Sequence, residues 1–219
     1  MEFEPVYIYP PDAEPNASDE IVLAAVFEEE DWEELSLQRD ALEFDSLYLG
    51  HNEFSNLRAK WRDPLYLRTF YDENIIYFQT PFWQGISRER FVADVAASRP
   101  VIFEDFTKSC VGHNVYNHFE PLTGFDAEVR SRNEREGKEH QLVRLKSKYG
   151  FIINKITFRI YAIEVDVGCF IITGGAIKIV KEMGQAPNTH LELRKINYLF
   201  DLLSAEGINT KEDLFNLLS

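Results

Sequence analysis

Basic side chains recur along three neighbouring segments in the C-terminal half of the chain, and each segment has the composition of a β-strand. Antiparallel pairing would gather these side chains on one surface, because cross-strand partners lie about 5 Å apart. Arg and Lys bind phosphates and stabilise charge at a phosphoryl centre, and Tyr adds a stacking ring and a hydroxyl. Cleavage of RNA through its own 2′-hydroxyl needs such stabilisation and proton transfer, and it needs no metal. The residues are Arg144, Lys146 and Lys148 in the first segment, Arg159 and Tyr161 in the second, and Lys178 and Lys181 at the end of the third.

A solvated sheet face that carries ordinary Lys and Arg would show the same pattern, so this alternative stays open. The sequence contains no GxSxG, GxGxxG, GxxxxGK[ST] or HExxH pattern that would indicate another chemistry. The Gly-containing stretch 173–176 is too short and too strand-like for a phosphate-binding loop. The basic strands are therefore the main candidate for a functional site.

The histidines and cysteines do not have the spacing of metal ligands. His113 and His118 are five residues apart, which fits neither one face of a helix nor one face of a strand. Cys110 and Cys169 form no CxxC pair, and we expect both to be buried free thiols. We therefore expect no metal and no cofactor.

The basic residues need a sheet to position them, and the central part of that sheet is predicted to be a hairpin. Residues 157–165 and 169–180 are rich in β-branched and aromatic residues and flank a turn at 166–168. Alternation places Arg159 and Tyr161 on one face, which we expect to be open, while the other face packs on the core. The pair Gly174 and Gly175 predicts a bulge or a close backbone approach.

The segments on either side of this hairpin complete a predicted α+β unit. Residues 142–149 alternate as a strand with a cationic stripe. The pattern Thr189-x-x-Glu192 predicts a capping box that opens an amphipathic helix ending near Gly207. A last short helix is expected to run to Leu218.

The middle of the chain is predicted to be helical and aromatic. Asp63 and Pro64 begin one helix, and Asn74 ends it. Ser87 caps another over residues 88–97, and Pro100 is expected to end it or to separate it from 101–109. Residues 127–141 are charged and polar, and we expect a mobile loop there.

The N-terminal part is rich in proline and acidic residues. Residues 6–9 are a candidate edge strand, and Ser18 is expected to cap a short helix through Phe27. Residues 28–34 are predicted to form an acidic helix with Trp32 turned inward. The alternative is a negative patch for a basic partner.

Charge is distributed unevenly along the 219 residues, whose net charge is −14. Residues 1–57 hold 16 acidic residues and one basic residue, whereas residues 130–159 hold nine basic and three acidic ones. Opposite charges of this size predict that the acidic segment lies near the basic strands and partly masks them. The chain lacks a long uncharged apolar run and a signal-like N-terminus, so we expect a cytoplasmic protein with no membrane association.

The stretch FRIYAIEVDVGCFIITGGAIKIVKEMGQAPNTHLELRKINYL at 158–199, together with LVRLKSKYG at 142–150, resembles the C-terminal half of RelE/HigB-like toxins of bacterial toxin–antitoxin systems. The shared features are an Arg–aromatic strand, a hairpin, a strand with a basic end, a Pro-containing loop and a helix. This resemblance covers roughly 142–203. Residues 54–203 also resemble a group of Bacteroidetes proteins with no known activity, through Phe119-Glu120-Pro121-Leu122 and a YAI…ITGGAIK core.

The toxin resemblance implies an endoribonuclease, an mRNA interferase, that acts on free or ribosome-associated mRNA and is restrained by an antitoxin protein. It gives catalytic roles to Arg159, Tyr161, Lys178 and His190, and RNA-binding roles to Arg144, Lys146, Lys148 and Lys181. The chain is longer and more acidic than such toxins, and no residue stands out as a general base. The alternative is a non-catalytic protein-interaction module that keeps the fold.

The fold we expect is α+β, with a helical N-terminal and middle region and a C-terminal antiparallel sheet with a packed helix, RelE-like. Residues 1–53 form an acidic N-terminal extension, and 54–219 form a helical segment plus the RelE-like domain. The sequence does not indicate an oligomeric state.

Overall fold

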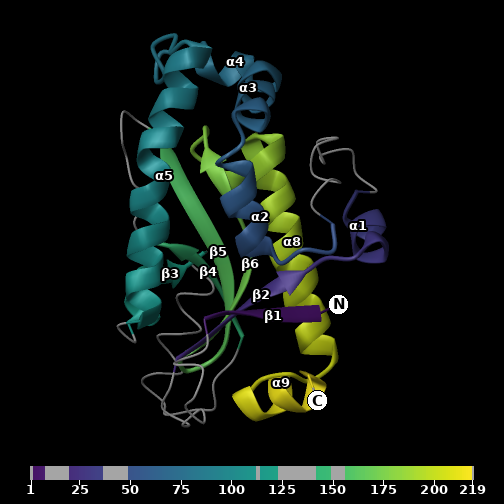
Figure 1. Ribbon diagram of the computed structural model, residues 1–219. Helices are drawn as coiled ribbons and strands as arrows, with labels where there is room; N and C mark the ends of the chain where they lie inside the picture. The colour runs from purple at the N-terminus through teal and green to yellow at the C-terminus, as the bar shows by residue number, and fades with distance from the viewer. Residues whose placement is uncertain are drawn as a thin grey trace.

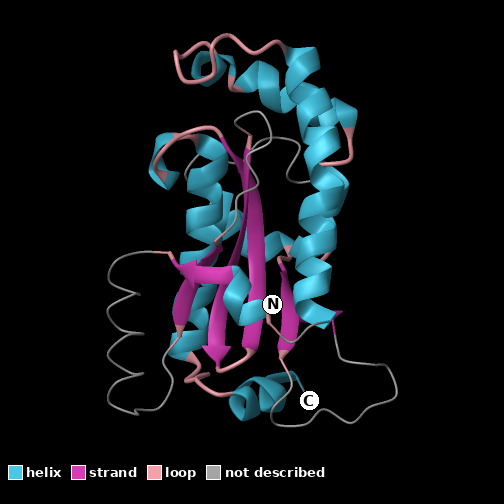
Figure 2. Cartoon of the chain, turned by 90° about the vertical axis from the view of Figure 1, so that its left-hand side faces the viewer, coloured by secondary structure: helices cyan, strands magenta, loops and turns pink. Residues whose placement is uncertain are grey.

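The chain folds into an α+β structure in which a six-stranded sheet has helices on both faces (Figures 1 and 2). The computed structural model describes residues 2–7, 20–36, 49–111, 114–122, 142–148 and 156–218. No helix in these ranges is long and apolar enough to cross a lipid bilayer. The predicted loop at 127–141 lies outside the described residues.

The sheet has the strand order β1-β2-β6-β5-β4-β3. Neighbouring strands are antiparallel, except that β2 and β6 are parallel, so the sheet is mixed. We had expected a purely antiparallel sheet in the C-terminal half. The sheet is instead mixed, and it includes two strands from the N-terminal segment. Its strands are β1 (Glu2–Tyr7), β2 (Ile21–Val26), β3 (Phe119–Pro121), β4 (Val143–Ser147), β5 (Thr157–Asp166) and β6 (Cys169–Lys178).

The N-terminal segment supplies two of these strands. The prediction of a Ser18-capped helix through Phe27 is wrong, because residues 21–26 are the strand β2. All six of its residues are buried. A short, uninterrupted apolar run is typical of a strand covered on both faces, and such a run cannot be distinguished from a buried helix by periodicity. An edge strand is present, but β1 covers residues 2–7 where 6–9 were predicted, and residues 8 and 9 lie outside the described ranges.

The β5–β6 hairpin agrees with the prediction, including its bulge. Tyr161 pairs with Gly174 and Ala162 pairs with Ile172, so Thr173 is the extra residue of β6. A Cβ on Gly175 would lie 2.5 Å from the carbonyl oxygen of Arg159. The glycine pair therefore marks both a bulge and a close backbone approach.

One face of the sheet packs on an aromatic core formed with the middle helices. Trp61, Phe70 and Phe106, each at most 1% exposed, belong to this core together with Phe158 and Ile160 of β5. The helices are α2 (Glu53–Lys60), α3 (Pro64–Glu73), α4 (Ile75–Phe78) and α5 (Arg88–Val111), and the short α6 (Val115–His118) leads into β3. The predicted helix start at Asp63 and stop at Asn74 are both present.

Helix α5 is continuous, so the prediction that Pro100 interrupts it is wrong. Proline inside a helix costs about 3 kcal/mol. Both halves of α5 bury large side chains in the same core, Phe91 and Val95 before the proline and Ile102 and Phe106 after it. Each such side chain contributes about 1.5–3 kcal/mol when buried. Tertiary packing therefore outweighs the local preference.

The other face is covered by α8 (Pro187–Ala205), with α1 (Glu29–Ser36) packed against α8 and α9 (Lys211–Leu218) at its end. Helix α8 begins at Pro187, so Thr189 is not its cap. The buried Thr189 hydroxyl instead donates to the carbonyls of Met183 and Ala186. The capping box that does form joins Glu182 and Gln185 at the 3-10 turn η2 (Met183–Gln185).

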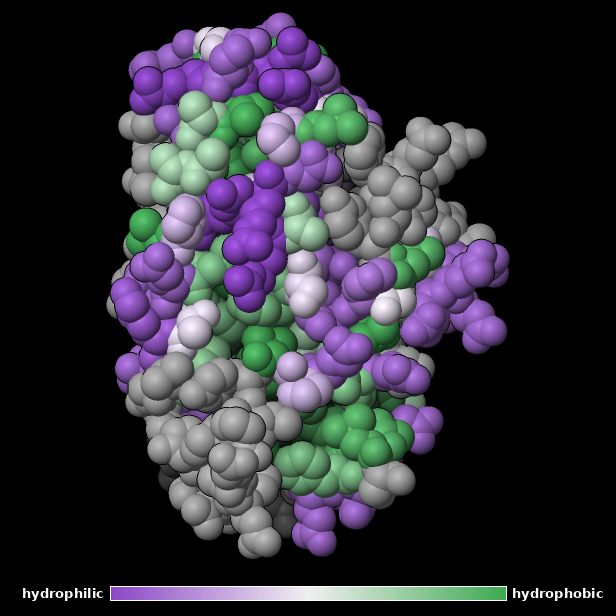
Figure 3. Space-filling model, in the orientation of Figure 1, coloured by the Kyte–Doolittle hydropathy of each residue, from purple (hydrophilic) through white to green (hydrophobic). Residues whose placement is uncertain are grey.

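The surface over these last helices is divided in character (Figure 3). Glu29 and Glu30 of α1 are exposed, as expected for an acidic helix, and Trp32 packs inward. Around α9 the surface is hydrophobic, because Phe215, Leu217 and Leu218 are 42%, 50% and 43% exposed. Helices cover the centre of the sheet on both faces. A surface site lies instead at the start of β5 and the end of β6.

Candidate functional site

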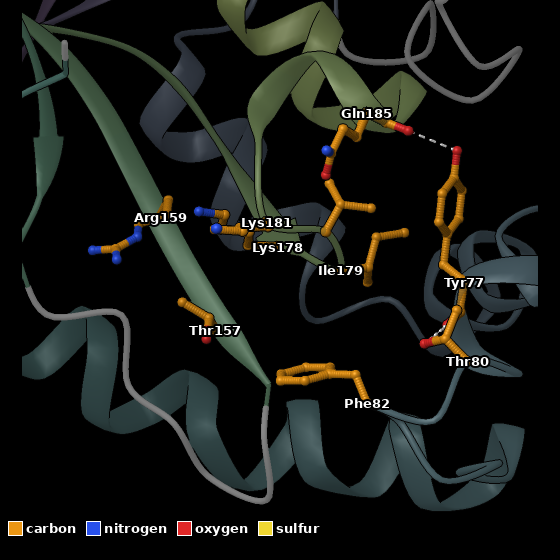
Figure 4. A pocket seen from close by; sticks show the side chains of 10 residues that line it. Tyr77, Thr80, Phe82, Thr157, Arg159, Lys178, Ile179, Lys181 and Gln185 are labelled. Atoms are coloured by element: carbon orange, nitrogen blue, oxygen red, sulfur yellow. Dashed lines mark hydrogen bonds between the residues drawn. The ribbon is translucent and has the colours of Figure 1, made fainter.

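A cavity of about 540 Å³ opens where β5 begins and β6 ends (Figure 4). Three basic side chains lie on one side of it, and an aromatic and apolar wall lies on the other. The wall comes from α4 and the turn after it, and from the segment between β6 and η2. The lining residues are Tyr77, Thr80, Phe82, Thr157, Arg159, Lys178, Ile179, Val180, Lys181 and Gln185.

Arg159 is fixed at the edge of this cavity by the end of β4. Its Nη1 donates to the carbonyl of Lys148 at 3.0 Å and to that of Ser147. The Ser147 hydroxyl in turn accepts the backbone N–H of Ile160 at 3.1 Å. The Nε of Arg159 is buried and has no hydrogen-bond partner among the described residues. A buried donor without a partner is costly to the fold.

Lys178 is half-buried and lies among other cations. Burial is the largest cause that lowers the pKa of Lys178, followed by the positive charges of Arg159 and Lys146. Lys146 lies 3.5 Å from the Glu120 carboxylate, whereas Lys178 has no carboxylate partner within the described part of the chain. The local field is therefore positive, and a bound anion would relieve the repulsion.

Lys181 adds a third positive charge from the exposed segment after β6. Figure 4 shows the amines of Lys178 and Lys181 pointing toward Arg159. Three of the residues predicted from the sequence thus meet at one cavity. A planar guanidinium and two ammonium groups are a donor set suited to phosphate.

The apolar wall is held in place by hydrogen bonds between distant parts of the chain. Trp83 Nε1 donates to the carbonyl of Ile179 at 3.1 Å, and the Tyr77 hydroxyl donates to the carbonyl of Gln185 at 2.9 Å. These bonds fix the turn after α4 against the end of β6. Phe82, next to the buried Trp83, is 63% exposed at the cavity.

Tyr161 is not available at this site. It is 1% exposed beneath α8, and burial together with the charge of Glu192 raises the pKa of its hydroxyl. The expectation of an open face carrying Arg159 and Tyr161 is wrong, because α8 packs over that face. Arg159 reaches a cavity only because it lies nearer the end of the strand.

The remaining predicted residues lie away from the cavity. Arg144 donates to Asn197 Oδ1 at 2.9 Å and lies 4.4 Å over the Phe200 ring, so it packs against α8. Lys148 and His190 are half-buried and are not among the lining residues. Sequence reasoning missed Tyr77, Thr80, Phe82 and Thr157. Tyr77 belongs to the segment 54–79, whose aromatic pattern indicated only a helical core, and Thr80 and Phe82 follow that segment.

A second charged cluster lies buried behind the hairpin. Lys195 of α8 is 1% exposed and donates to Glu53 Oε2 at 2.5 Å and to Glu192 Oε1 at 2.9 Å. The cluster lies against Gly174, where a Cβ would come within 1.9 Å of Glu192 Oε2. Burial raises the pKa of Glu192 to about 7, with Lys195 opposing that shift. These charges join α2, α8 and the bulge of β6.

The described acidic residues of the segment 1–57 do not lie over the basic strands. Glu34 and Asp31 of α1 contact Arg194 and Tyr198 of α8, on a different face of that helix from the one that contacts Arg144. The masking hypothesis therefore finds no support in the described residues. Much of the basic stretch 130–159, including residues 130–141 and 149–155, lies outside them.

The cysteines and histidines form no metal centre in the part of the chain that the structure describes. Cys110 and Cys169 are buried free thiols, as expected, and burial raises the pKa of each to about 12. His118 is buried against the Phe106 ring at 5.2 Å, and burial lowers its pKa. His113 lies outside the described residues.

Comparisons with protein-family models, with curated proteins and with solved structures find no match to this chain. The cavity has an apolar wall and two lysine amines that point toward Arg159, whose buried Nε has no partner among the described residues.

Proposed function

We propose that the chain binds RNA through its phosphodiester backbone, with the phosphate held by Arg159, Lys178 and Lys181. The observation that carries this proposal is that Arg159, Lys178 and Lys181 line one cavity, where the two lysine amines point toward Arg159. Hydrogen bonds between charged donors and phosphate are about twice as strong as neutral ones. A phosphate would offset the repulsion that Lys178 experiences from Arg159 and Lys146.

The proposal extends to RNA cleavage by a RelE-like toxin of a toxin–antitoxin system. In that reaction the 2′-hydroxyl loses its proton to solvent and bonds to the adjacent phosphorus, which gives a 2′,3′-cyclic phosphate as the bond from phosphorus to the 5′-oxygen breaks. Arg159 and Lys181 would stabilise the charge on the phosphoryl oxygens, and the Lys178 ammonium would donate a proton to the 5′-oxygen. The lowered pKa of Lys178 supports this role, since it makes the ammonium a better acid. An antitoxin would be the implied protein partner.

A non-catalytic interaction module is the second candidate function. Tyr161 is buried, and the described lining residues include no His, Asp or Glu that would act as a general base. In this case the cavity binds an anionic group of a partner and performs no reaction. If the chain binds RNA but does not cleave it, the non-catalytic module is favoured, and the proposal that the cavity binds RNA still stands.

The experiment uses the purified chain and a short single-stranded RNA labelled at its 5′ end. Arg159→Ala should weaken binding and abolish cleavage, whereas Lys108→Ala should change neither. Lys108 is a matched control because it is an exposed cation near the end of α5, paired with Glu104, and does not line the cavity. Equal binding by the wild-type chain and Arg159→Ala would contradict the proposal.

Expression in bacterial cells tests the toxin part separately. The wild-type chain should arrest growth and translation, and Arg159→Ala should relieve the arrest at an equal protein level. Equal growth with both chains, together with intact RNA in the cleavage assay, would leave the non-catalytic module as the account of this site.

A further inference from the structure

The aromatic wall of the cavity lies on the other side from the lysines of the proposed phosphate site (Figure 4). Phe82 is 63% exposed, and its ring packs edge-on against the buried Trp83 with the ring centroids 5.4 Å apart. Its ring points toward Thr157 at the mouth of the cavity, with Ile179 beside it. Tyr77 and Val180 continue the wall.

From this arrangement we infer that the cavity takes one unpaired nucleotide of single-stranded RNA, with its base packed against Phe82 and its phosphate on Arg159 and Lys178. This inference rests on the proposed binding of RNA and adds the class of RNA. Bases stack on aromatic side chains in single-strand recognition, and cations hold the adjoining phosphate. Phe82 would be the residue that distinguishes a nucleotide from other phosphate esters.

The size of the cavity fits this ligand. Sites for small molecules have volumes of about 300–1,000 Å³, and this cavity of about 540 Å³ lies within that range. In a duplex the bases are stacked and paired, so a base cannot enter a cavity of this kind without first leaving its partner. Single-stranded RNA should therefore bind and duplex RNA should not.

The wall is also preformed. The bonds from Trp83 Nε1 to the Ile179 carbonyl and from the Tyr77 hydroxyl to the Gln185 carbonyl join α4 and the turn after it to the segment that follows Lys178. The Thr80 hydroxyl donates to the carbonyl of Tyr77 at 2.7 Å, which further fixes the turn. The ring and the cations are thus parts of one rigid structure, and binding needs little reordering.

The first test compares three ligands by calorimetric titration: adenosine 5′-monophosphate, ribose 5-phosphate and inorganic phosphate. The wild-type chain should bind the nucleotide about tenfold more tightly than ribose 5-phosphate, since stacking on an aromatic ring contributes strongly for each base. Phe82→Ala should remove this difference, and Phe82→Trp should keep it. Ile76→Ala is the matched control, because Ile76 is 66% exposed on α4 and does not line the cavity.

The second test measures binding of a labelled single strand and of the same strand annealed to its complement. Preference for the single strand that is lost in Phe82→Ala supports the inference. Equal affinity of the wild-type chain for the nucleotide and for ribose 5-phosphate, with both weakened by Arg159→Ala, would overturn the aromatic site and leave the phosphate site standing. Absence of any effect of Arg159→Ala would overturn both.

Discussion

Two charged clusters beside the β5–β6 hairpin differ in what surrounds their lysines. At the end of β6, Lys178 lies beside Arg159 and faces a cavity, with no carboxylate partner among the described residues. Behind the bulge of β6, Lys195 is 1% exposed and pairs with the carboxylates of Glu53 and Glu192. The residue type is the same, but the first lysine has an incomplete set of partners and the second a complete one.

This difference in partners indicates that one cluster stabilises the fold and the other binds a ligand. A buried ion pair is strongly destabilising when one partner is lost, because the other is left as an uncompensated charge. A cluster of like charges at a surface cavity costs stability until an anion binds. Lys195 is therefore expected to maintain the fold, and Lys178 is expected to act on a ligand. Substitutions at the two positions should have opposite consequences.

The largest expected effect is on stability at Lys195. Lys195→Met should lower the free energy of unfolding by about 3–5 kcal/mol, because Glu53 and Glu192 would remain buried without their cation. Lys178→Met is the matched comparison, and it should leave stability nearly unchanged or raise it slightly, since it removes repulsion with Arg159. Urea denaturation followed by circular dichroism measures both. Equal loss of stability in the two variants would remove the distinction between the clusters.

The next effect is a dependence of stability on pH at Glu192. Burial raises the folded-state pKa of Glu192 from 4.5 to about 7, so the folded chain holds this proton more tightly than the unfolded chain. This contribution is fully present below about pH 4.5 and is lost as the pH rises through about 7. Its full size is on the order of 3 kcal/mol, with Lys195, Glu53 and Lys60 as the neighbouring charges.

Urea midpoints measured between pH 4.5 and 8 test this dependence. Glu192→Gln should flatten the profile over that interval, because a neutral amide does not titrate. The cavity residue Lys178 provides the comparison, and Lys178→Met should keep the wild-type slope across the same interval. A wild-type profile with the slope of Glu192→Gln would show that Glu192 is already ionised at low pH.

A smaller effect on stability is expected at Gly174, the glycine of β6 that lies against the Lys195 cluster. Gly174 has a φ of +148°, and a Cβ there would meet Glu192 Oε2 at 1.9 Å and Lys195 Nζ at 2.7 Å. Gly174→Ala should therefore cost about 1–3 kcal/mol through strain and overpacking. Gly184→Ala is the control, because nothing lies within 4 Å of its added Cβ. Thermal melts of the two variants give the comparison, and equal melting temperatures would contradict it.

Much of the fold was predictable from local patterns. Alternation at 157–165 and 169–180 predicted β5 and β6, and Asp63 before Pro64 predicted the start of α3. The errors arose where burial outweighed local signals. The apolar run 21–26 became a strand because both its faces are covered, and α5 continues through Pro100 because both its halves pack on one core.

The candidate site was only half predictable. Arg159, Lys178 and Lys181 were identified because strand pairing brings basic residues together. The wall with Tyr77 and Phe82 depends on the bond from Trp83 to Ile179, two residues 96 positions apart, and no local pattern indicates such a contact. Tyr161 was wrongly expected to be accessible, because the sequence does not show that α8 covers its face of the sheet.

The most direct test of the central claim is a salt series of RNA titrations with the wild-type chain, Arg159→Ala and Lys108→Ala. Three cations on a single strand predict that log K falls with log salt with a slope of about −2, and loss of one cation should reduce the slope by about 0.7. We predict this reduced slope and a weaker affinity for Arg159→Ala, with wild-type values for Lys108→Ala. Identical affinities and slopes for all three chains would contradict the account.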